Sequence, residues 1–241
     1  MSSTDTGVVA VTGGTSRRAG VLASVAALVP PTGRWRVGVD GVDGAGKSVF
    51  ASGLAAVLRE RGREVVHASA DDVLNPRGVR YRRGRDDPEG FYRDSVDTAA
   101  LLRELLEPFG PAGTGSHRRR VHDLATDRPV DTPPTSAGPH GVLVLDGIFL
   151  QAPALTGALD LVVFLRASFA ATYARMAVRD GCPPDPDHPA NRRYRQGQQL
   201  YLDEIAPADR ADVLVDVEDV HRPRVLRLPP ADRSRRGHRA G

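Results

Sequence analysis

The sequence predicts an α/β fold, a three-layer αβα sandwich in which helices cover both faces of a five-stranded parallel sheet. Two observations predict it. Short β-rich segments alternate along the chain with segments whose apolar residues recur at helical spacing, which is typical of parallel sheets with right-handed crossovers. The length of 241 residues is enough for one such domain with a full hydrophobic core.

The chain begins with a segment that carries neither a strand signal nor a helix signal. Residues 1–15 are small and polar, which predicts a disordered N-terminus. A helix is expected within 16–33, because apolar residues follow capping residues and Pro30-Pro31 ends the pattern. The α/β domain itself is expected to span 34–217.

Strands and helices alternate within that span. The run at 142–146 is wholly apolar until its last residue, as in strands buried on both faces of a sheet. The five strands are expected at 35–40, 64–68, 142–146, 159–165 and 211–217. The helices are expected, from the spacing of their apolar residues, at 48–61, 91–106, 169–180 and 192–205.

Three segments interrupt this alternation. Residues 108–141 are rich in Gly, Pro and Arg, with a small hairpin expected around 118–130, and a connection of that length is usually functional or disordered. Residues 181–199 open on a stretch rich in Pro and Asp and are expected to form a small lid. Residues 218–241 are expected to be a basic, solvated tail.

The most informative motif is a glycine-rich loop after the first strand. Gly41-Val42-Asp43-Gly44-Ala45-Gly46-Lys47-Ser48 fits the phosphate-binding (Walker A) pattern, and Lys47 is the only lysine in the chain. A compact ammonium can reach between β- and γ-phosphate oxygens, where a planar guanidinium is too wide. Strand, loop and helix in this order predict a P-loop NTPase fold that binds ATP through the loop and Val49.

Individual residues of the loop have specific expected roles. Gly44 and Gly46 allow positive φ and close approach of a phosphate. Ser48 is expected to offer its hydroxyl to Mg²⁺. The alternative interpretation is a glycine-rich turn before an ordinary helix.

Two acidic residues follow the second strand. Asp71 and Asp72 are expected at the carboxyl edge of the sheet, beside the phosphate loop. A carboxylate there can accept a proton from an attacking hydroxyl or hold Mg²⁺. Capping of a helix is the alternative for either residue. Asp71 and Lys47 are the predicted catalytic residues.

Asp146 ends the apolar strand at 142–146 and precedes Gly147. A buried strand tolerates an acid only where the acid is paired or faces a cleft. An acid at this place is the usual second element on the metal side of a nucleotide site. The predicted metal site therefore consists of Ser48 and Asp146.

Arginine supplies almost all of the positive charge. Clusters lie at 77–85 and 118–120, and most of their members are expected to be solvated or bonded to nearby acids. Arg175 and Arg179 lie one helical turn apart before the expected hinge, and Arg192, Arg193 and Arg195 lie beyond it. Arginines on both sides of a mobile segment can close on a transferring phosphoryl group, and Arg175 and Arg179 are predicted to bind the substrate. Pairing along an exposed helix is the alternative.

Composition limits the other function classes. The net charge of +3 comes largely from the arginine clusters and the tail, so it does not indicate nucleic-acid binding. A single cysteine, Cys182, excludes an internal disulfide framework and fits a reducing cytoplasm. The apolar stretch 21–29 is too short to cross a bilayer. We expect a cytoplasmic protein without nucleic-acid or membrane partners; its oligomeric state is not indicated.

The order of the motifs resembles the uridine kinase and phosphoribulokinase group of P-loop kinases, including actinobacterial uridine kinase-like proteins. Ser69-Ala70-Asp71-Asp72 resembles the family segment whose Asp serves as base, which implies that Asp71 is the base. Asp86-Asp87-Pro88-Glu89-Gly90-Phe91 resembles the Asp-His-Pro-Asp/Glu-Ala-Phe element, which implies that Asp86 binds ribose hydroxyls. Asp146-Gly147 and Arg179-Asp180 resemble the family's Glu-Gly and its Arg-Asp before the lid.

This resemblance covers about 34–217 and implies ATP-dependent phosphoryl transfer to a hydroxyl of a nucleoside or similar metabolite. The family's Tyr-Asp…His-Ser-Arg stretch is replaced by residues 122–128, and its Arg-Gly-Arg is missing from the lid. Two alternatives stay open. One is a nucleoside monophosphate kinase or ATPase, since arginine clusters suit a phosphorylated acceptor. The other is a nucleotide-binding regulator that has lost acceptor recognition.

Overall fold

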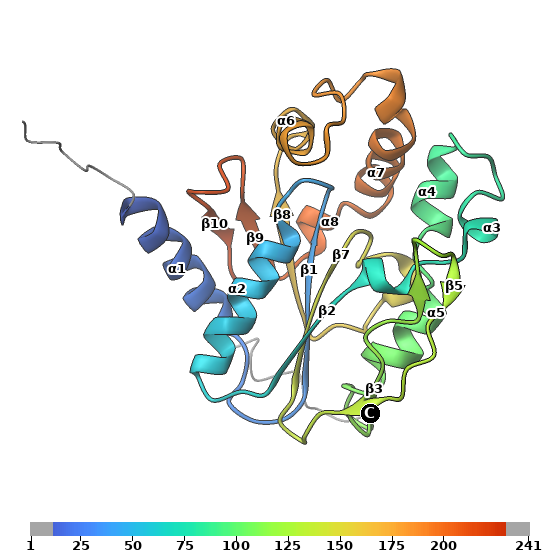
Figure 1. The fold of residues 1–241 in the computed structure, drawn as a ribbon. Helices are drawn as coiled ribbons and strands as arrows, with labels where there is room; N and C mark the ends of the chain where they lie inside the picture. The colour runs from blue at the N-terminus through green and yellow to red at the C-terminus, as the bar shows by residue number, and fades with distance from the viewer. Residues whose placement is uncertain (1–11, 230–241) are drawn as a thin grey trace, which may run out of the picture.

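The computed structural model describes residues 12–229, which form the predicted three-layer sandwich (Figure 1). The sheet order is β10-β9-β8-β1-β7-β2, with β1 between β7 and β8 and parallel to both. The parallel strands are β1 (Trp35–Gly41), β2 (Val65–Ser69), β7 (Val142–Gly147), β8 (Leu161–Arg166) and β9 (Val213–Asp216). Residues 1–11 of the segment 1–15 predicted to be disordered, and residues 230–241 of the predicted basic tail 218–241, lie outside the described residues.

Within residues 12–229 the sheet has six strands, so the predicted number of five is wrong. The sixth strand, β10 (Arg224–Arg227), lies in the segment predicted to be a basic tail and pairs with β9 in antiparallel orientation. Val225 packs against the core, and Arg227 donates to the carbonyl of Ala211 at 2.6 Å. A four-residue strand with an arginine at each end is too short and too polar for its period to be recognised in the sequence.

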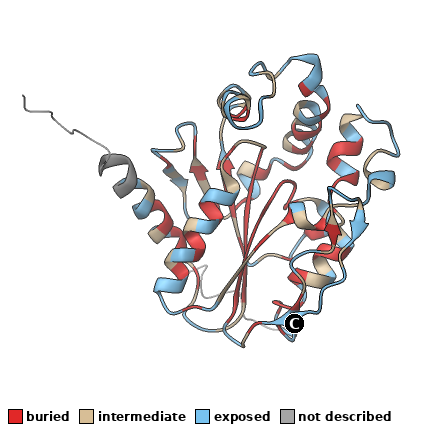
Figure 2. Ribbon diagram, viewed as in Figure 1, coloured by how far each residue is buried: buried red, intermediate tan, exposed pale blue. Residues whose placement is uncertain are grey.

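Two long helices cover one face of the sheet. α1 (Thr12–Ala26) and α2 (Lys47–Glu60) pack side by side, and their buried residues share a core with β1, β7, β8 and β9 (Figures 1 and 2). α1 begins inside the segment 1–15 that was predicted to be disordered and ends before Pro30. Every helix within 12–229 falls short of the length and apolar content that a bilayer span requires.

The opposite face is covered by shorter elements. These are η1 (Ala70–Val73), α5 (Thr98–Leu101), η2 (Leu102–Leu106) and η3 (Pro153–Leu155). The single helix predicted at 91–106 is broken, because α4 (Pro88–Asp94) ends and α5 starts anew. The Asp97 carboxylate caps α5 by accepting the N–H of Ala100 at 2.9 Å, which stabilises the break.

The remaining helices are α3 (Arg77–Arg80), α6 (Phe169–Asp180), η4 (Pro189–Asn191), α7 (Arg192–Ile205) and α8 (Pro207–Arg210). Of these, α6 and α7 stand above the carboxyl edge of the sheet (Figure 1). The predicted bounds of α6 and α7 are confirmed. α4 and α7 lie side by side and share an aromatic core that contains Phe91, Tyr92 and Tyr201. This packing places α7 between two loops of the candidate site.

The long connection 108–141 contains two small antiparallel pairs. β4 (His122–Asp123) pairs with β5 (Arg128–Pro129), which confirms the hairpin predicted around 118–130. β3 (Ser116–His117) pairs with β6 (Thr135–Ser136). The N–H of Val121 donates to the carbonyl of Asp72 at 3.1 Å, so the connection is attached to η1.

Candidate active site

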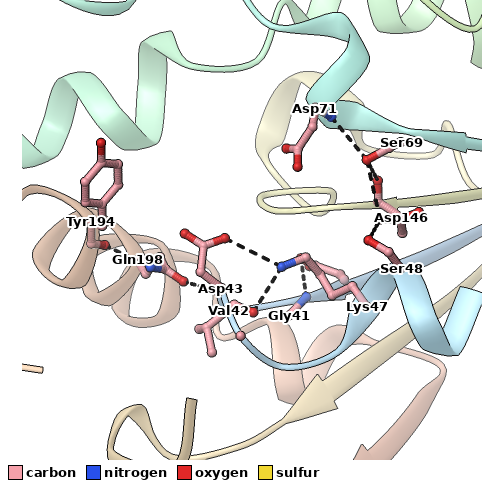
Figure 3. Close-up of polar contacts among 12 residues, drawn as sticks. Gly41, Val42, Asp43, Lys47, Ser48, Ser69, Asp71, Asp146, Tyr194 and Gln198 are labelled. Carbon is pink, nitrogen blue, oxygen red and sulfur yellow. Dashed lines mark hydrogen bonds and ion pairs between the residues drawn. The ribbon is translucent and has the colours of Figure 1, made fainter. Parts of the chain in front are cut away.

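The glycine-rich loop joins β1 to α2 at the carboxyl edge of the sheet (Figure 3). Gly44 and Gly46 have φ of 75° and 86°, as predicted. A Cβ on Gly44 would lie 2.6 Å from the carbonyl oxygen of Thr172, so packing against α6 also requires glycine there. The loop and the first turn of α2 together have the backbone geometry of an anion cradle.

Lys47 opens α2 and reaches back over the loop. Its Nζ lies 3.0 Å from the carbonyl oxygen of Val42 and 3.8 Å from Oδ1 of Asp43. Only 11% of the side chain is exposed. The ammonium is therefore fixed beside the loop amides, where a polyphosphate would meet both.

Ser48 and Asp146 lie together beside Lys47 (Figure 3). The Ser48 hydroxyl donates to Oδ2 of Asp146 at 2.7 Å, and Oδ1 of the same carboxylate lies 2.8 Å from Nε2 of His67. Asp146 is buried at the end of β7. The carboxylate is thereby oriented from both sides, by α2 and by the edge strand β2.

This pair fits a magnesium ion by its chemistry. A hydroxyl and a carboxylate are hard oxygen donors, and Mg²⁺ in nucleotide sites takes one or two protein oxygens while phosphates and water supply the rest. Within residues 12–229, no group of three or more His, Cys, Asp and Glu side chains could hold a metal by itself. Ser48 and Asp146 would hold the ion together with the nucleotide.

Asp71 lies in η1, directly after β2. Ser69, and not Asp71, caps this turn, because its Oγ accepts the N–H of Asp71 at 3.3 Å. The Asp71 carboxylate makes no cap and points into the space next to the Lys47 ammonium (Figure 3). This geometry removes the capping alternative for Asp71.

The surroundings of Asp71 favour its protonated form. Solvent reaches the residue, but the walls of the cleft partly desolvate its carboxylate, and this raises the pKa of Asp71. The charge of Lys47 lowers the pKa, while the charges of Asp43, Asp146 and Asp72 raise it. A carboxylate with a raised pKa is better matched to accept a proton near neutral pH.

Asp86 lies in the loop between α3 and α4 and is exposed. Its neighbour Asp87 caps α4 by accepting the N–H of Gly90 at 2.5 Å, which leaves Asp86 outside the helix. We call residues 81–87 the acceptor loop, after the role that the resemblance implies for Asp86.

The two predicted substrate arginines lie on the other side of the phosphate loop. Arg175 donates to the carbonyls of Gly44 at 3.2 Å and Val217 at 2.8 Å. Arg179 pairs with Asp180 at 2.7 Å and is largely exposed. Both line a cavity of about 360 Å³ with apolar walls that include Val49, Met176, Val220 and Pro223.

Three site residues escaped prediction. His67 is the histidine of β2. Its contact with Asp146 depends on the strand register that pairs Ser69 with Asp146. Asp40, fully buried before the loop, accepts hydrogen bonds from Gln151 and Tyr201, and burial raises its pKa. Gln198 of α7 accepts the N–H of Asp43 at 2.5 Å. The only sequence signal for Asp40 was an acid at the end of a buried strand.

The fold is similar to three solved kinase structures. A possible uridine kinase from Bacillus stearothermophilus is 23% identical, with 83% of this chain and 98% of that chain covered and a TM-score of 0.65. A proposed fructose transport system kinase from Silicibacter is 23% identical (74% and 93% covered, TM-score 0.57). Phosphoribulokinase from Rhodobacter spheroides is 14% identical (83% and 77% covered, TM-score 0.53). The chain has the P-loop kinase fold.

The resemblance to the uridine kinase and phosphoribulokinase group is thereby confirmed at the level of the fold. No protein-family model and no curated protein matches the sequence. In this P-loop kinase fold the phosphate loop, Asp71 and Asp146 meet at one edge of the sheet, as the motif order predicted.

Most arginines of the two predicted clusters are bonded to acids. Arg82 and Arg83 both pair with the buried Asp94, Arg118 pairs with Glu104, and Arg120 with Asp123. These guanidinium groups are committed to structural contacts.

Proposed function

We propose that the protein is an ATP-dependent kinase that phosphorylates a hydroxyl group of a nucleoside or another ribose- or polyol-bearing metabolite. The observation that carries the proposal is the arrangement of three groups around one space (Figure 3). These groups are the Lys47 ammonium, the Ser48–Asp146 pair and the Asp71 carboxylate, which caps no helix, and they come from α2, β7 and η1. This is the set that in-line phosphoryl transfer requires.

Each residue has a defined part in the proposed reaction. Lys47 and the loop amides bind the β- and γ-phosphates and offset the charge that develops on them. Asp71 accepts the proton of the attacking hydroxyl. Mg²⁺, when bound by Ser48 and Asp146, neutralises phosphate charge. Most of the rate enhancement comes from positioning, because phosphoryl transfer needs little covalent chemistry from the protein.

The 360 Å³ cavity supports a nucleotide with its base on the far side of the phosphate loop. Its apolar walls suit a planar base, and it opens next to Gly44 and Gly46. Arg175 and Arg179 line this cavity, so we assign them to the nucleotide rather than to the acceptor.

The arginine pairing argues against an acceptor that already carries a phosphate. A nucleoside monophosphate kinase needs guanidinium groups on the acceptor side that can bind a phosphate, but Arg82, Arg83, Arg118 and Arg120 are held by acids, and Arg85 of the acceptor loop stacks over the Tyr81 ring. The unused Asp71 carboxylate argues against a regulator without catalysis. A hydroxyl acceptor is consistent with both features, because it requires a base such as Asp71 and no additional arginine for a second phosphate.

A panel of nucleosides, sugars and polyols, assayed for release of ADP from ATP, tests the proposal. Release that depends on one class of acceptor supports a kinase. Release without any acceptor indicates an ATPase, and nucleotide binding without release indicates a regulator; either result overturns the proposal.

Replacing Asp86 by alanine is expected to raise KM for the acceptor and leave KM for ATP nearly unchanged. A carboxylate that binds acceptor hydroxyls makes charge-assisted hydrogen bonds, each worth ~1.5–3 kcal/mol. With the wild type, an acceptor that lacks the matching hydroxyl should lose a similar amount of binding free energy. With the variant, the same deoxy acceptor should lose little more, because the two changes remove the same contact. An undiminished deoxy penalty in the variant would show that Asp86 does not touch the acceptor.

Replacing Asp146 by asparagine is expected to weaken binding of MgADP by at least about 10-fold, the lower end of what loss of a metal-orienting group costs. Binding of metal-free ADP should change much less, because the phosphate loop is intact. Calorimetric titration with and without Mg²⁺ separates the two. Equal losses under both conditions would mean that Asp146 supports the loop and not the metal.

A further inference from the structure

Helix α7 is bonded to both halves of the candidate site. The acceptor loop and α4 lie on one side of α7, and the phosphate loop lies on the other (Figures 1 and 3). The N-terminal half of α7 belongs to the predicted lid 181–199, yet two of its side chains are buried anchors. Each anchor reaches a different loop.

The first anchor is Arg193, which holds the acceptor loop. Its side chain is buried and its guanidinium donates to four backbone carbonyls. These hydrogen bonds go to the carbonyl oxygens of Arg80 (2.9 Å), Gly84 (3.2 Å), Arg85 (3.0 Å) and Asp87 (3.0 Å). The guanidinium also stacks over Tyr81, with its carbon 4.8 Å from the ring centroid. The carbonyls on both sides of Asp86 are therefore fixed by one residue of α7.

The second anchor is Gln198, which holds the phosphate loop. It is 1% exposed; its Oε1 accepts the N–H of Asp43 at 2.5 Å and its Nε2 donates to the carbonyl of Tyr194 at 3.1 Å. Three residues further on, the Tyr201 hydroxyl donates to Asp40, directly before the loop. Because the amide of Gln198 is bonded at both ends, it transmits the position of α7 to Asp43.

The two anchors lie on the same continuous helix. They lie five positions apart, which is ~7.5 Å along a continuous helix. Between them Gly197 packs against α4, where a Cβ would lie 2.6 Å from the carbonyl oxygen of Pro88. A shift or rotation of α7 that moves the Asp43 amide must therefore also move the carbonyls of the acceptor loop.

We propose that α7 couples the two substrate sites, with Arg193 and Gln198 as positioning residues: ordering of the phosphate loop by nucleotide orders the acceptor loop, and the reverse. The proposal rests on the proposed function only for what the two loops bind. Such coupling is reciprocal, so a change at the acceptor loop must alter nucleotide affinity. Neither residue contacts the reacting groups.

Hydrogen–deuterium exchange with MgADP as the only ligand tests one direction. In the wild type, saturating MgADP should slow exchange both in residues 41–48 and in the acceptor loop. In Gln198→Leu, which keeps the size of the side chain but not its hydrogen bonds, slowing at 41–48 should persist while slowing at the acceptor loop is lost. Gln196→Ala is the matched control, because among the described residues the side chain of this exposed glutamine of α7 bonds only to Arg192.

Nucleotide affinity tests the other direction. Arg193→Lys keeps the charge but cannot bond four carbonyls, and it should weaken MgADP by several-fold although the residue lies outside the nucleotide cavity. Gln196→Ala should leave the affinity unchanged. Melting temperatures and exchange in the central strands show that each variant is folded; should Arg193→Lys not fold, the Gln198→Leu experiment decides alone.

The outcomes separate this proposal from the proposed function. If MgADP does not bind the wild type, the kinase proposal fails and α7 has nothing to couple. If MgADP binds and protects 41–48 but leaves the acceptor loop unprotected in the wild type, the coupling is wrong and the kinase proposal stands. Equal acceptor-loop protection in the wild type and in Gln198→Leu also overturns the role of Gln198.

Discussion

Replacing Lys47 by alanine is expected to lower kcat by on the order of 100-fold or more and to leave the fold intact, because one cation of the phosphate clamp is lost. Lys47 is the only lysine in the chain, so no other ammonium can take its place. Within residues 12–229 its ammonium bonds only to the loop itself, at the Val42 carbonyl and the Asp43 carboxylate, so little stability depends on it. Steady-state rates and a thermal melt measure the two effects.

Lys47→Arg is the control for charge. It keeps the positive charge, but a planar guanidinium does not fit between phosphate oxygens, so most of the activity should still be lost. Recovery of activity in the arginine variant would mean that only net charge matters at this position. An alanine variant that keeps more than about half of the wild-type rate, with an unchanged melting temperature, would contradict the proposed site altogether.

The parts of the fold that the sequence predicted are those with local signals. Ser168 caps α6 by accepting the N–H of Ala171, and Gly181 ends it in a left-handed conformation, so both ends could be read from the sequence. The break between α4 and α5 could not, because Asp97 is a favourable cap inside a pattern that otherwise continues the helix. β10 is fixed by its partner β9 and carries almost no signal of its own.

The candidate site divides in the same way. The loop 41–48, Asp71 and Asp146 follow strands whose ends meet at one edge of a parallel sheet, so their proximity is a consequence of the fold. His67 and Gln198 depend on side-chain contacts between elements far apart in sequence. Asp43 and Gln198 lie 155 positions apart, and no pattern in the sequence pairs them. Such contacts come from the packing of α7 and the register of β2, which local propensity does not determine.

Replacing Asp71 by asparagine is expected to lower kcat strongly while binding of ATP changes little. Asparagine keeps the size of the side chain but cannot accept the proton of the attacking hydroxyl, and positioned bases typically contribute about 10²–10⁴-fold. Asp72→Asn is the matched control, since Asp72 is the next residue and its carboxylate lies 3.7 Å from Arg120, away from the phosphate loop. Steady-state rates and calorimetric titration with ATP are compared for both variants.

The pH dependence of kcat gives Asp71 a second signature. A base acts only when it is deprotonated, and desolvation in the cleft raises the pKa of Asp71, so the rate should fall as the pH is lowered through that raised value, at a higher pH than for an ordinary aspartate. The Asn variant should lose this acid limb and keep a small, flat residual rate, whereas Asp72→Asn should keep the limb at full amplitude. If Asp71→Asn retains both the wild-type rate and the acid limb, Asp71 is not the base and the proton is accepted by another group of the site.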